Sequence, residues 1–163
     1  LNFGRRGATS FITGRLRVGE AMSPPLIKRV RAARDPERIT LIDAPPGTSC
    51  PVIAAMNGAD FVLMVTEPTP FGLHDLKLAK EAVKILGIPC GLVVNRADIG
   101  DDQVFAYARE ENLPVLLTIP FDRRIAEAYS RGATMVEALP EWEPKFLRLF
   151  ADIAAIIERG AAQ

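Results

Sequence analysis

The chain has 163 residues, carries no formal net charge at neutral pH, and is 48% hydrophobic. This length and composition predict a single globular domain over residues 1–163 with a hydrophobic core of its own, and they argue against a disordered chain. No apolar run approaches the roughly 18 residues that a membrane-spanning helix needs, and the start lacks the pattern of a secretory signal peptide.

Cysteine content and charge distribution bear on location and partners. Two cysteines, Cys50 and Cys90, are too few for a disulfide framework, which favours a cytoplasmic location. Residues 1–38 hold nine Lys/Arg against three Asp/Glu. These basic residues are spread over several elements, so we expect a solvated surface and not a nucleic-acid site. The first residue is Leu1 and not Met, which indicates a fragment of a longer protein.

Apolar strands alternate with helical patterns along most of the chain. After a glycine-rich start, residues 10–18 read as a strand, and Ser23 followed by two prolines opens a helix. Four further strands are predicted at residues 39–43, 61–66, 88–95 and 115–119, and helices at residues 50–57, 71–86, 101–112, 122–130 and 143–159. Strands that are apolar on both faces and are joined by helices predict an α/β fold with a doubly wound, mostly parallel sheet flanked by helices.

The stretch over residues 39–52 reads ITLIDAPPGTSCPV, and its apolar run ends abruptly at Asp43. A buried parallel strand with this ending delivers a carboxylate to the carboxyl edge of the sheet, where open α/β folds bind ligands. Gly47 in the following loop lets a backbone N–H approach a ligand closely. We therefore expect Asp43 to hold magnesium through a water and Gly47 N–H to face a terminal phosphate. The alternative is that Asp43 only caps the next helix.

Two later strand ends also carry candidate binding residues. One predicted strand ends in Asn95, with Asp98 shortly after it, and an asparagine there can offer both a donor and an acceptor to a base edge. In form this segment resembles the base-reading Asn-Lys-x-Asp motif of GTPases. The last predicted strand is followed by Pro120 and Asp122.

Several segments together resemble the MinD/ParA family of P-loop ATPases, and most of all its subfamily with an inserted ferredoxin domain. They are TGRLRVGE, LIDAPPGTSCPVIA, GADFVLMVTEPTPFGLHDL, VVNRAD and IPFDRRIAEA, and they span residues 13–140 approximately. The Walker A motif and the ferredoxin insert of that subfamily are absent from this sequence. The resemblance therefore implies the C-terminal portion of a MinD/ParA-like nucleotide-binding domain, with a sheet that is incomplete at its N-terminal side.

The resemblance also implies functional residues and partners. Asp43 would serve magnesium and Gly47 the terminal phosphate of ATP, while Asn95, Pro120 and Asp122 would lie beside adenine. The complete protein would be a homodimeric, nucleotide-switched ATPase that couples to iron–sulfur or electron-transfer chemistry, whose cluster would sit in the missing insert. These 163 residues alone are not expected to hydrolyse ATP. A C-terminal amphipathic helix binds membranes in MinD-type proteins, so residues 143–159 have that alternative to packing on the sheet.

Other interpretations remain open from the sequence. The chain is alternatively a nonenzymatic dimerisation or interaction module that has lost nucleotide binding, or a relative of ATP-dependent amidoligases. Cys50 stands where nitrogenase-type iron proteins carry a cluster ligand, but we expect it to be a small residue at a helix start. His74, the only histidine, is expected at the surface or at an interface.

Overall fold

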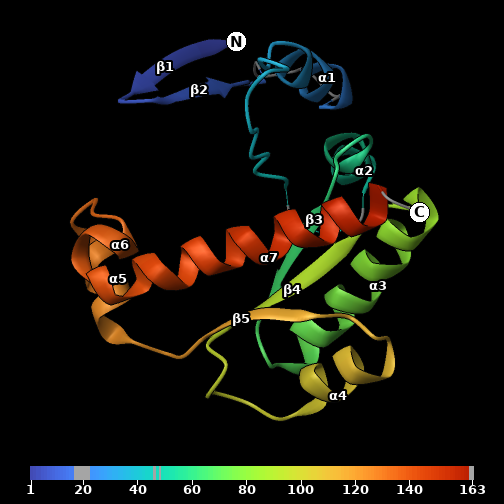
Figure 1. Cartoon of the computed structure of the whole chain (residues 1–163), viewed down its shortest axis with the longest axis vertical. Helices are drawn as coiled ribbons and strands as arrows, with labels where there is room; N and C mark the ends of the chain where they lie inside the picture. Colours follow the sequence, from blue (N-terminus) through green and yellow to red (C-terminus); the bar gives the residue numbers. More distant parts are fainter. Residues whose placement is uncertain (17–22, 46, 48, 162–163) are drawn as a thin grey trace. The chain divides into compact units, whose positions relative to one another are not determined.

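The computed structural model describes residues 1–16, 23–45, 47 and 49–161 (Figure 1). These residues form two compact units, Leu1–Gly58 and Ala59–Gln163, which are described separately below.

The first unit consists of a hairpin and two helices. Strands β1 (Asn2–Arg6) and β2 (Thr9–Thr13) pair antiparallel, with Arg6 opposite Thr9. Gly7 in the turn has a φ of 59°, a left-handed conformation that costs glycine little. Helices α1 (Pro24–Ala32) and α2 (Cys50–Met56) follow, and each has proline in its first turn, where no backbone hydrogen bond is lost.

The contact between α1 and α2 is fixed by an arginine. Arg31 Nη1 donates to the carbonyl oxygen of Ala54 at a distance of 2.9 Å, in the last turn of α2. The last carbonyls of a helix lack intrahelical donors and carry partial negative charge, so a guanidinium there is favourable. Gly14 lies so close to α1 that a Cβ would come within 2.9 Å of the Leu26 and Val30 side chains. The absence of a side chain therefore permits this approach.

Two strand predictions in this unit need correction. The prediction of a buried strand at residues 39–43 is wrong: these residues form no strand, and Ile39 and Leu41 are 75% and 90% exposed. Strand propensity expresses the fit of a side chain to a neighbouring strand. Among the described residues of this unit, only β1 and β2 form a ladder. The strand expected at residues 10–18 is shorter, its partner β1 was not predicted, and residues 17 and 18 lie outside the described residues.

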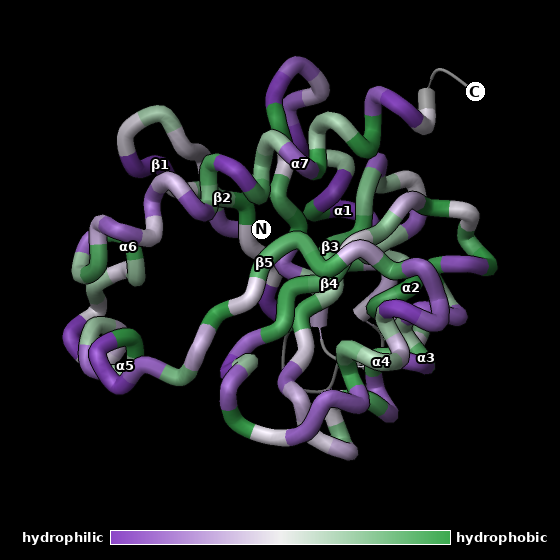
Figure 2. The backbone as a smooth tube through the Cα atoms, turned by 60° about the horizontal axis from the view of Figure 1, so that its bottom comes forward, coloured by the Kyte–Doolittle hydropathy of each residue, from purple (hydrophilic) through white to green (hydrophobic). Residues whose placement is uncertain are grey.

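The second unit is built on a three-stranded parallel sheet. Its strands β3 (Val62–Thr66), β4 (Cys90–Asn95) and β5 (Val115–Ile119) lie in the order β3-β4-β5. Helix α3 (Pro70–Leu86) connects β3 to β4, and α4 (Gln103–Glu110) connects β4 to β5. Figures 1 and 2 show α3 and α4 on one side of this sheet and α7 (Glu143–Ala161) on the opposite side. The predicted α/β fold, with a parallel sheet flanked by helices, is confirmed.

The core of this unit surrounds the central strand. Leu92 and Val94 of β4 have no exposed surface, and Val93 on the other face is nearly as buried. Figure 2 accordingly shows hydrophobic residues concentrated along the three strands. Helix α3 adds Leu76 and Val83 to the core. The two residues are two helical turns apart and lie on the same face of the helix.

The helix ends follow their expected chemistry. Thr69 caps α3, because its Oγ1 accepts from Gly72 N at 3.0 Å, and Gly87 ends the helix with a φ of 67°. Thr134 and Glu137 form a capping box at the start of α6 (Met135–Ala138).

A second apolar cluster lies beyond β5. Helix α5 (Arg123–Ser130), α6 and the 3-10 helix η1 (Pro140–Trp142) lead into α7. Met135, Leu139 and Trp142 are buried together, and the Trp142 and Phe146 rings have centroids 6.2 Å apart. These contacts and buried Leu149 hold α7 to the unit, which agrees with the packing prediction for residues 143–159. No helix in the described part of the chain is long and apolar enough to cross a membrane.

We predict that Leu92→Ala lowers the free energy of unfolding by about 2–5 kcal/mol, because it removes a fully buried side chain from the central strand. Chemical denaturation followed by circular dichroism measures this loss. The control is Ile85→Ala on α3, whose side chain is 85% exposed, and we expect a change within about 0.5 kcal/mol. Equal losses for the two variants would contradict the burial described for β4.

Candidate functional site

The carboxyl ends of three parallel strands meet at one edge of the sheet in the second unit. Strand β3 is followed by Glu67, β4 ends in Asn95, and β5 is followed by Pro120. Because the strands are parallel and adjacent, these residues share one edge, the usual position of ligands in open α/β sheets. The structure thus places Asn95, Pro120 and Asp122 at the same edge of the sheet, and their contact with adenine stays a prediction.

Asn95 is held by a carboxylate that the sequence analysis did not single out. Its Nδ2 donates to Glu67 Oε1 at 3.2 Å, and both residues are partly buried. No hydrogen bond from the described residues reaches Asn95 Oδ1. The signal that could have found Glu67 is its place at the carboxyl end of a predicted strand, since Asn95 was identified from the end of the next strand.

Arg96 is the second residue that sequence reasoning missed. Its φ of 50° is unusual for a residue with a side chain, and such strain is concentrated at functional sites. Its Nε lies 3.6 Å from Glu67 Oε1, and its guanidinium lies 5.8 Å from the centre of the Phe121 ring. Glu67 therefore contacts both residues at the end of β4, and Phe121 offers a half-exposed aromatic surface beside them.

Asp98 ties two edge loops together. Its Oδ1 accepts from the backbone N–H of Phe121, and the neighbouring Ala97 N donates to Ile119 O at 2.9 Å. One carboxylate oxygen of Asp98 is thus occupied by the loop after β5. Asp98 therefore stabilises the contact between the loop after β4 and the loop after β5.

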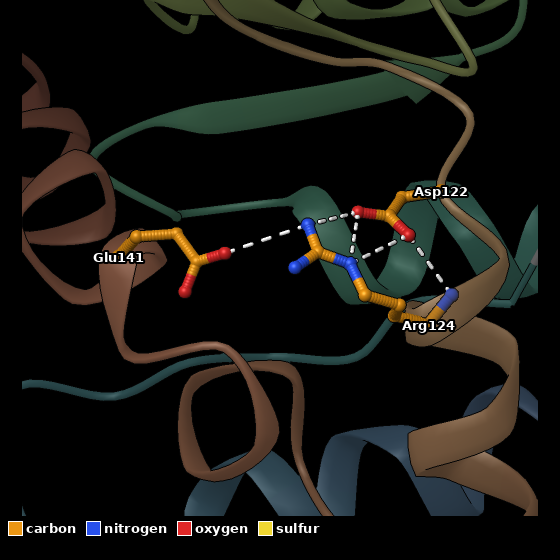
Figure 3. Close-up of polar contacts among 3 residues, drawn as sticks. All are labelled: Asp122, Arg124 and Glu141. Atoms are coloured by element: carbon orange, nitrogen blue, oxygen red, sulfur yellow. Dashed lines mark hydrogen bonds and ion pairs between the residues drawn. The ribbon is translucent and has the colours of Figure 1, made fainter.

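Asp122 lies at the start of α5, where Figure 3 shows its contacts. Its Oδ1 accepts from Arg124 N at 2.9 Å, and its Oδ2 accepts from Arg124 Nη2 at 2.6 Å. Arg124 Nη2 also lies 3.5 Å from Glu141 Oε1. The Arg124 side chain and backbone hydrogen bonds lower the pKa of the Asp122 carboxyl, and Asp122 raises the pKa of Arg124 in turn. Pro120 just before is exposed.

Asp43 and Gly47 belong to the first unit, and both are exposed. Gly47 has a φ of 90°, so the loop needs glycine for its backbone conformation, even though a Cβ would meet no atom within 4 Å. Pro46 and Thr48 beside it lie outside the described residues. The alternative that Asp43 caps the next helix is wrong, because α2 begins at Cys50 with Ser49 in the capping position.

Over residues 1–16, 23–45, 47 and 49–161, no three His, Cys, Asp or Glu side chains gather as a metal site would require. Cys50 is exposed at the first position of α2, as expected for a helix start. Burial raises the pKa of the half-buried Cys90 thiol, and Lys80 opposes this shift. His74 is at the surface of α3. The magnesium role of Asp43 stays a prediction.

Two curated proteins are similar to this chain over part of their length. No protein-family model matches the chain. The uncharacterized protein MJ0579 of Methanocaldococcus jannaschii is 34% identical over 129 residues, which are 77% of this chain and 44% of that protein. The uncharacterized protein MJ0578 of the same organism is 30% identical over 87 residues, which are 52% of this chain and 32% of that protein. The chain therefore spans less than half the length of these relatives.

A solved structure shares the fold. The cell division ATPase MinD of Pyrococcus furiosus is 29% identical to this chain, with a TM-score of 0.58. The similarity covers 83% of this chain and 56% of that chain. The parallel sheet and its flanking helices thus have the MinD-like P-loop NTPase fold, and the sheet edge described above is its ligand-binding side by the general rule for open α/β sheets.

We predict that Arg124→Gln raises the pKa of the Asp122 carboxyl toward its ordinary value of 3.8, because the lowering comes mainly from Arg124 hydrogen bonds. The control is Arg123→Gln, which removes the adjacent charge that pairs with Glu127 and leaves Asp122 untouched. Carbon-13 NMR titration of the Asp122 carboxyl measures both.

The lowered pKa of Asp122 also determines how its contribution to stability changes with pH. The folded pKa of Asp122 lies below its unfolded value, so its stabilisation is present above about pH 4 and is lost as the pH falls through the folded pKa. The destabilisation caused by Asp122→Asn should therefore shrink on acidification. A difference that grows as the pH falls would contradict this assignment.

Proposed function

We propose that the chain is the C-terminal portion of a MinD/ParA-like ATPase that acts as a nucleotide-dependent switch, with residues 1–163 belonging to one nucleotide-binding domain. The observation that carries the proposal is the sheet edge formed by Glu67, Asn95 and the loop from Pro120 to Asp122. The 29% identity and shared fold with the MinD ATPase support it. Phosphate-binding amides and the catalytic lysine would lie in a preceding segment of the protein.

In this proposal the sheet edge holds the adenine base. Asn95 offers an acceptor, Oδ1, that no described residue uses, and Phe121 offers a half-exposed ring on which a planar base can lie. Pro120 and Asp122 border the same loop, and hydrogen bonds from Arg124 hold the Asp122 carboxylate in position. The residues present therefore fit a nucleotide base.

Asp43 and Gly47 would act at the phosphate end of the nucleotide. Asp43 has no hydrogen bond or ion pair among the described residues, so its carboxylate is available to the water shell of a magnesium ion. Gly47 presents backbone without a Cβ in a left-handed conformation that suits close approach to a phosphate. Magnesium, when bound with ATP, neutralises phosphate charge during transfer.

The proposal extends to partners and location. In this proposal the complete protein is a homodimer in the cytoplasm. It belongs to the subfamily whose ferredoxin insert links the ATPase to iron–sulfur chemistry. The resemblance implies that the insert and its cluster lie in a preceding segment of the protein.

A binding module without nucleotide is the second candidate. It is favoured by three exposed apolar side chains, Phe71, Leu78 and Ile85, which recur every seven residues along α3. The coding sequence before Leu1 separates the two candidates. A glycine-rich loop with lysine supports the ATPase, and the absence of one favours the module.

We predict that the 163-residue chain binds magnesium-ATP weakly or not at all, and that the complete gene product binds it with micromolar affinity, because phosphate recognition depends on amides that this chain lacks. Isothermal titration calorimetry of both proteins measures the difference. Micromolar binding by the 163 residues alone would show that they contain a phosphate site of their own.

We also predict that Asp43→Asn in the complete protein lowers ATP turnover about 100-fold or more while ATP affinity changes little, since the amide keeps the size and loses the charge. Turnover is measured at saturating magnesium. Asp60→Asn is the control, because it removes the same charge from another exposed aspartate. Turnover of the Asp43 variant within about twofold of wild type would remove Asp43 from the catalytic machinery.

A further inference from the structure

Among the described residues, Glu67 is the side chain that contacts both Asn95 and Arg96 at the end of β4. Its Oε1 accepts from Asn95 Nδ2 at 3.2 Å and lies 3.6 Å from Arg96 Nε. The side chain of Glu67 is 39% exposed, so these contacts are partly shielded from water. A charge-assisted hydrogen bond in such a place is stronger and more directional than one between neutral groups.

This contact decides how the Asn95 amide is oriented. An ionised carboxylate accepts hydrogen bonds and donates none, so Asn95 must turn its NH2 group toward Glu67. Its Oδ1 acceptor and its second Nδ2 hydrogen then remain available to a ligand, each at a fixed position. A free asparagine could rotate its amide by half a turn and exchange these positions.

Glu67 itself is held by a tightly packed turn. Thr66 Oγ1 donates to Gly72 O at 2.9 Å, and Thr69 N donates to Glu67 O at 2.8 Å. A Cβ on Gly72 would come within 2.3 Å of Glu67 O, and one on Gly100 within 1.8 Å of the Pro68 carbonyl oxygen. The backbone on both sides of Glu67 therefore has little room to move, which preorganises the carboxylate.

We propose that Glu67 is a positioning residue that locks the Asn95 amide so that the site accepts a 6-aminopurine and rejects a 6-oxopurine. The inference rests on the proposed nucleotide-binding function. The 6-amino group and N7 of adenine match an acceptor beside a donor, whereas a 6-oxo group places an acceptor against Asn95 Oδ1. Glu67 also pairs with Arg96 and so keeps its guanidinium near the Phe121 ring.

The first test measures nucleotide discrimination in the complete gene product. ATP and inosine triphosphate share sugar and phosphates and differ at the 6-position, so the ratio of their dissociation constants isolates base recognition. We expect a preference for ATP of about tenfold in the wild type. In Glu67→Gln, whose amide can present oxygen or NH2 to Asn95, we expect the preference to fall to about threefold or less. The control Glu81→Gln removes a charge from the exposed face of α3 and should leave the ratio unchanged.

The outcomes separate this inference from the proposed function. A wild-type preference that persists in Glu67→Gln, or an equal loss of affinity for both nucleotides, overturns the positioning role and leaves the ATPase proposal standing. Binding of neither nucleotide by the wild-type gene product overturns both.

A second test needs no variant and no nucleotide. Nitrogen-15 NMR of the 163-residue chain resolves the two Asn95 Nδ2 hydrogens, and the one bonded to Glu67 should exchange with water more slowly than the other. Equal exchange of the two hydrogens, at the rate of an exposed asparagine side chain, would show that the lock does not exist.

Discussion

Parallel pairing of β4 between β3 and β5 is the constraint on which the second unit depends. Leu92, Val93 and Val94 are buried on both faces of this strand, so helices must cover the sheet on both sides. Parallel strands also require long crossover connections, and these place α3 and α4 together on one face. The same pairing brings three strand ends to one edge, so the core and the candidate site have a common origin.

The candidate site combines rigid backbone with a small number of charged contacts. Asp98 joins the loop after β4 to the loop after β5, and Arg124 holds Asp122 at the start of α5. Because these contacts are exposed, each adds little to stability. Their effect is on geometry: Asp98 fixes the backbone of Phe121 beside the end of β4, and Arg124 fixes the carboxylate of Asp122.

Local sequence patterns predicted the strands of the second unit and the longer helices of both units, but they failed for the strands of the first unit. Helix α3 was readable from the spacing of Leu76 and Val83 and from Gly87 at its end, all signals within one segment. Residues 39–43 have the composition of a strand, but a strand also needs a partner in space. The contact of Glu67 with Asn95 joins residues 28 positions apart, and the left-handed conformation of Arg96 has no signature in its residue type. Neither feature could be read from the chain alone.

Gly72 and Gly100 divide the sheet edge into a part that resists change and a part that tolerates it. A Cβ on Gly72 would collide with the carbonyl oxygen of Glu67, and a Cβ on Gly100 with that of Pro68. Neither position therefore accepts a larger residue. Glu67, Arg96 and Phe121, by contrast, project from the same edge with part of each side chain in solvent. Substitutions of Glu67 and Phe121 would therefore change the charge and the apolar surface of this edge, while the backbone that carries them stays the same.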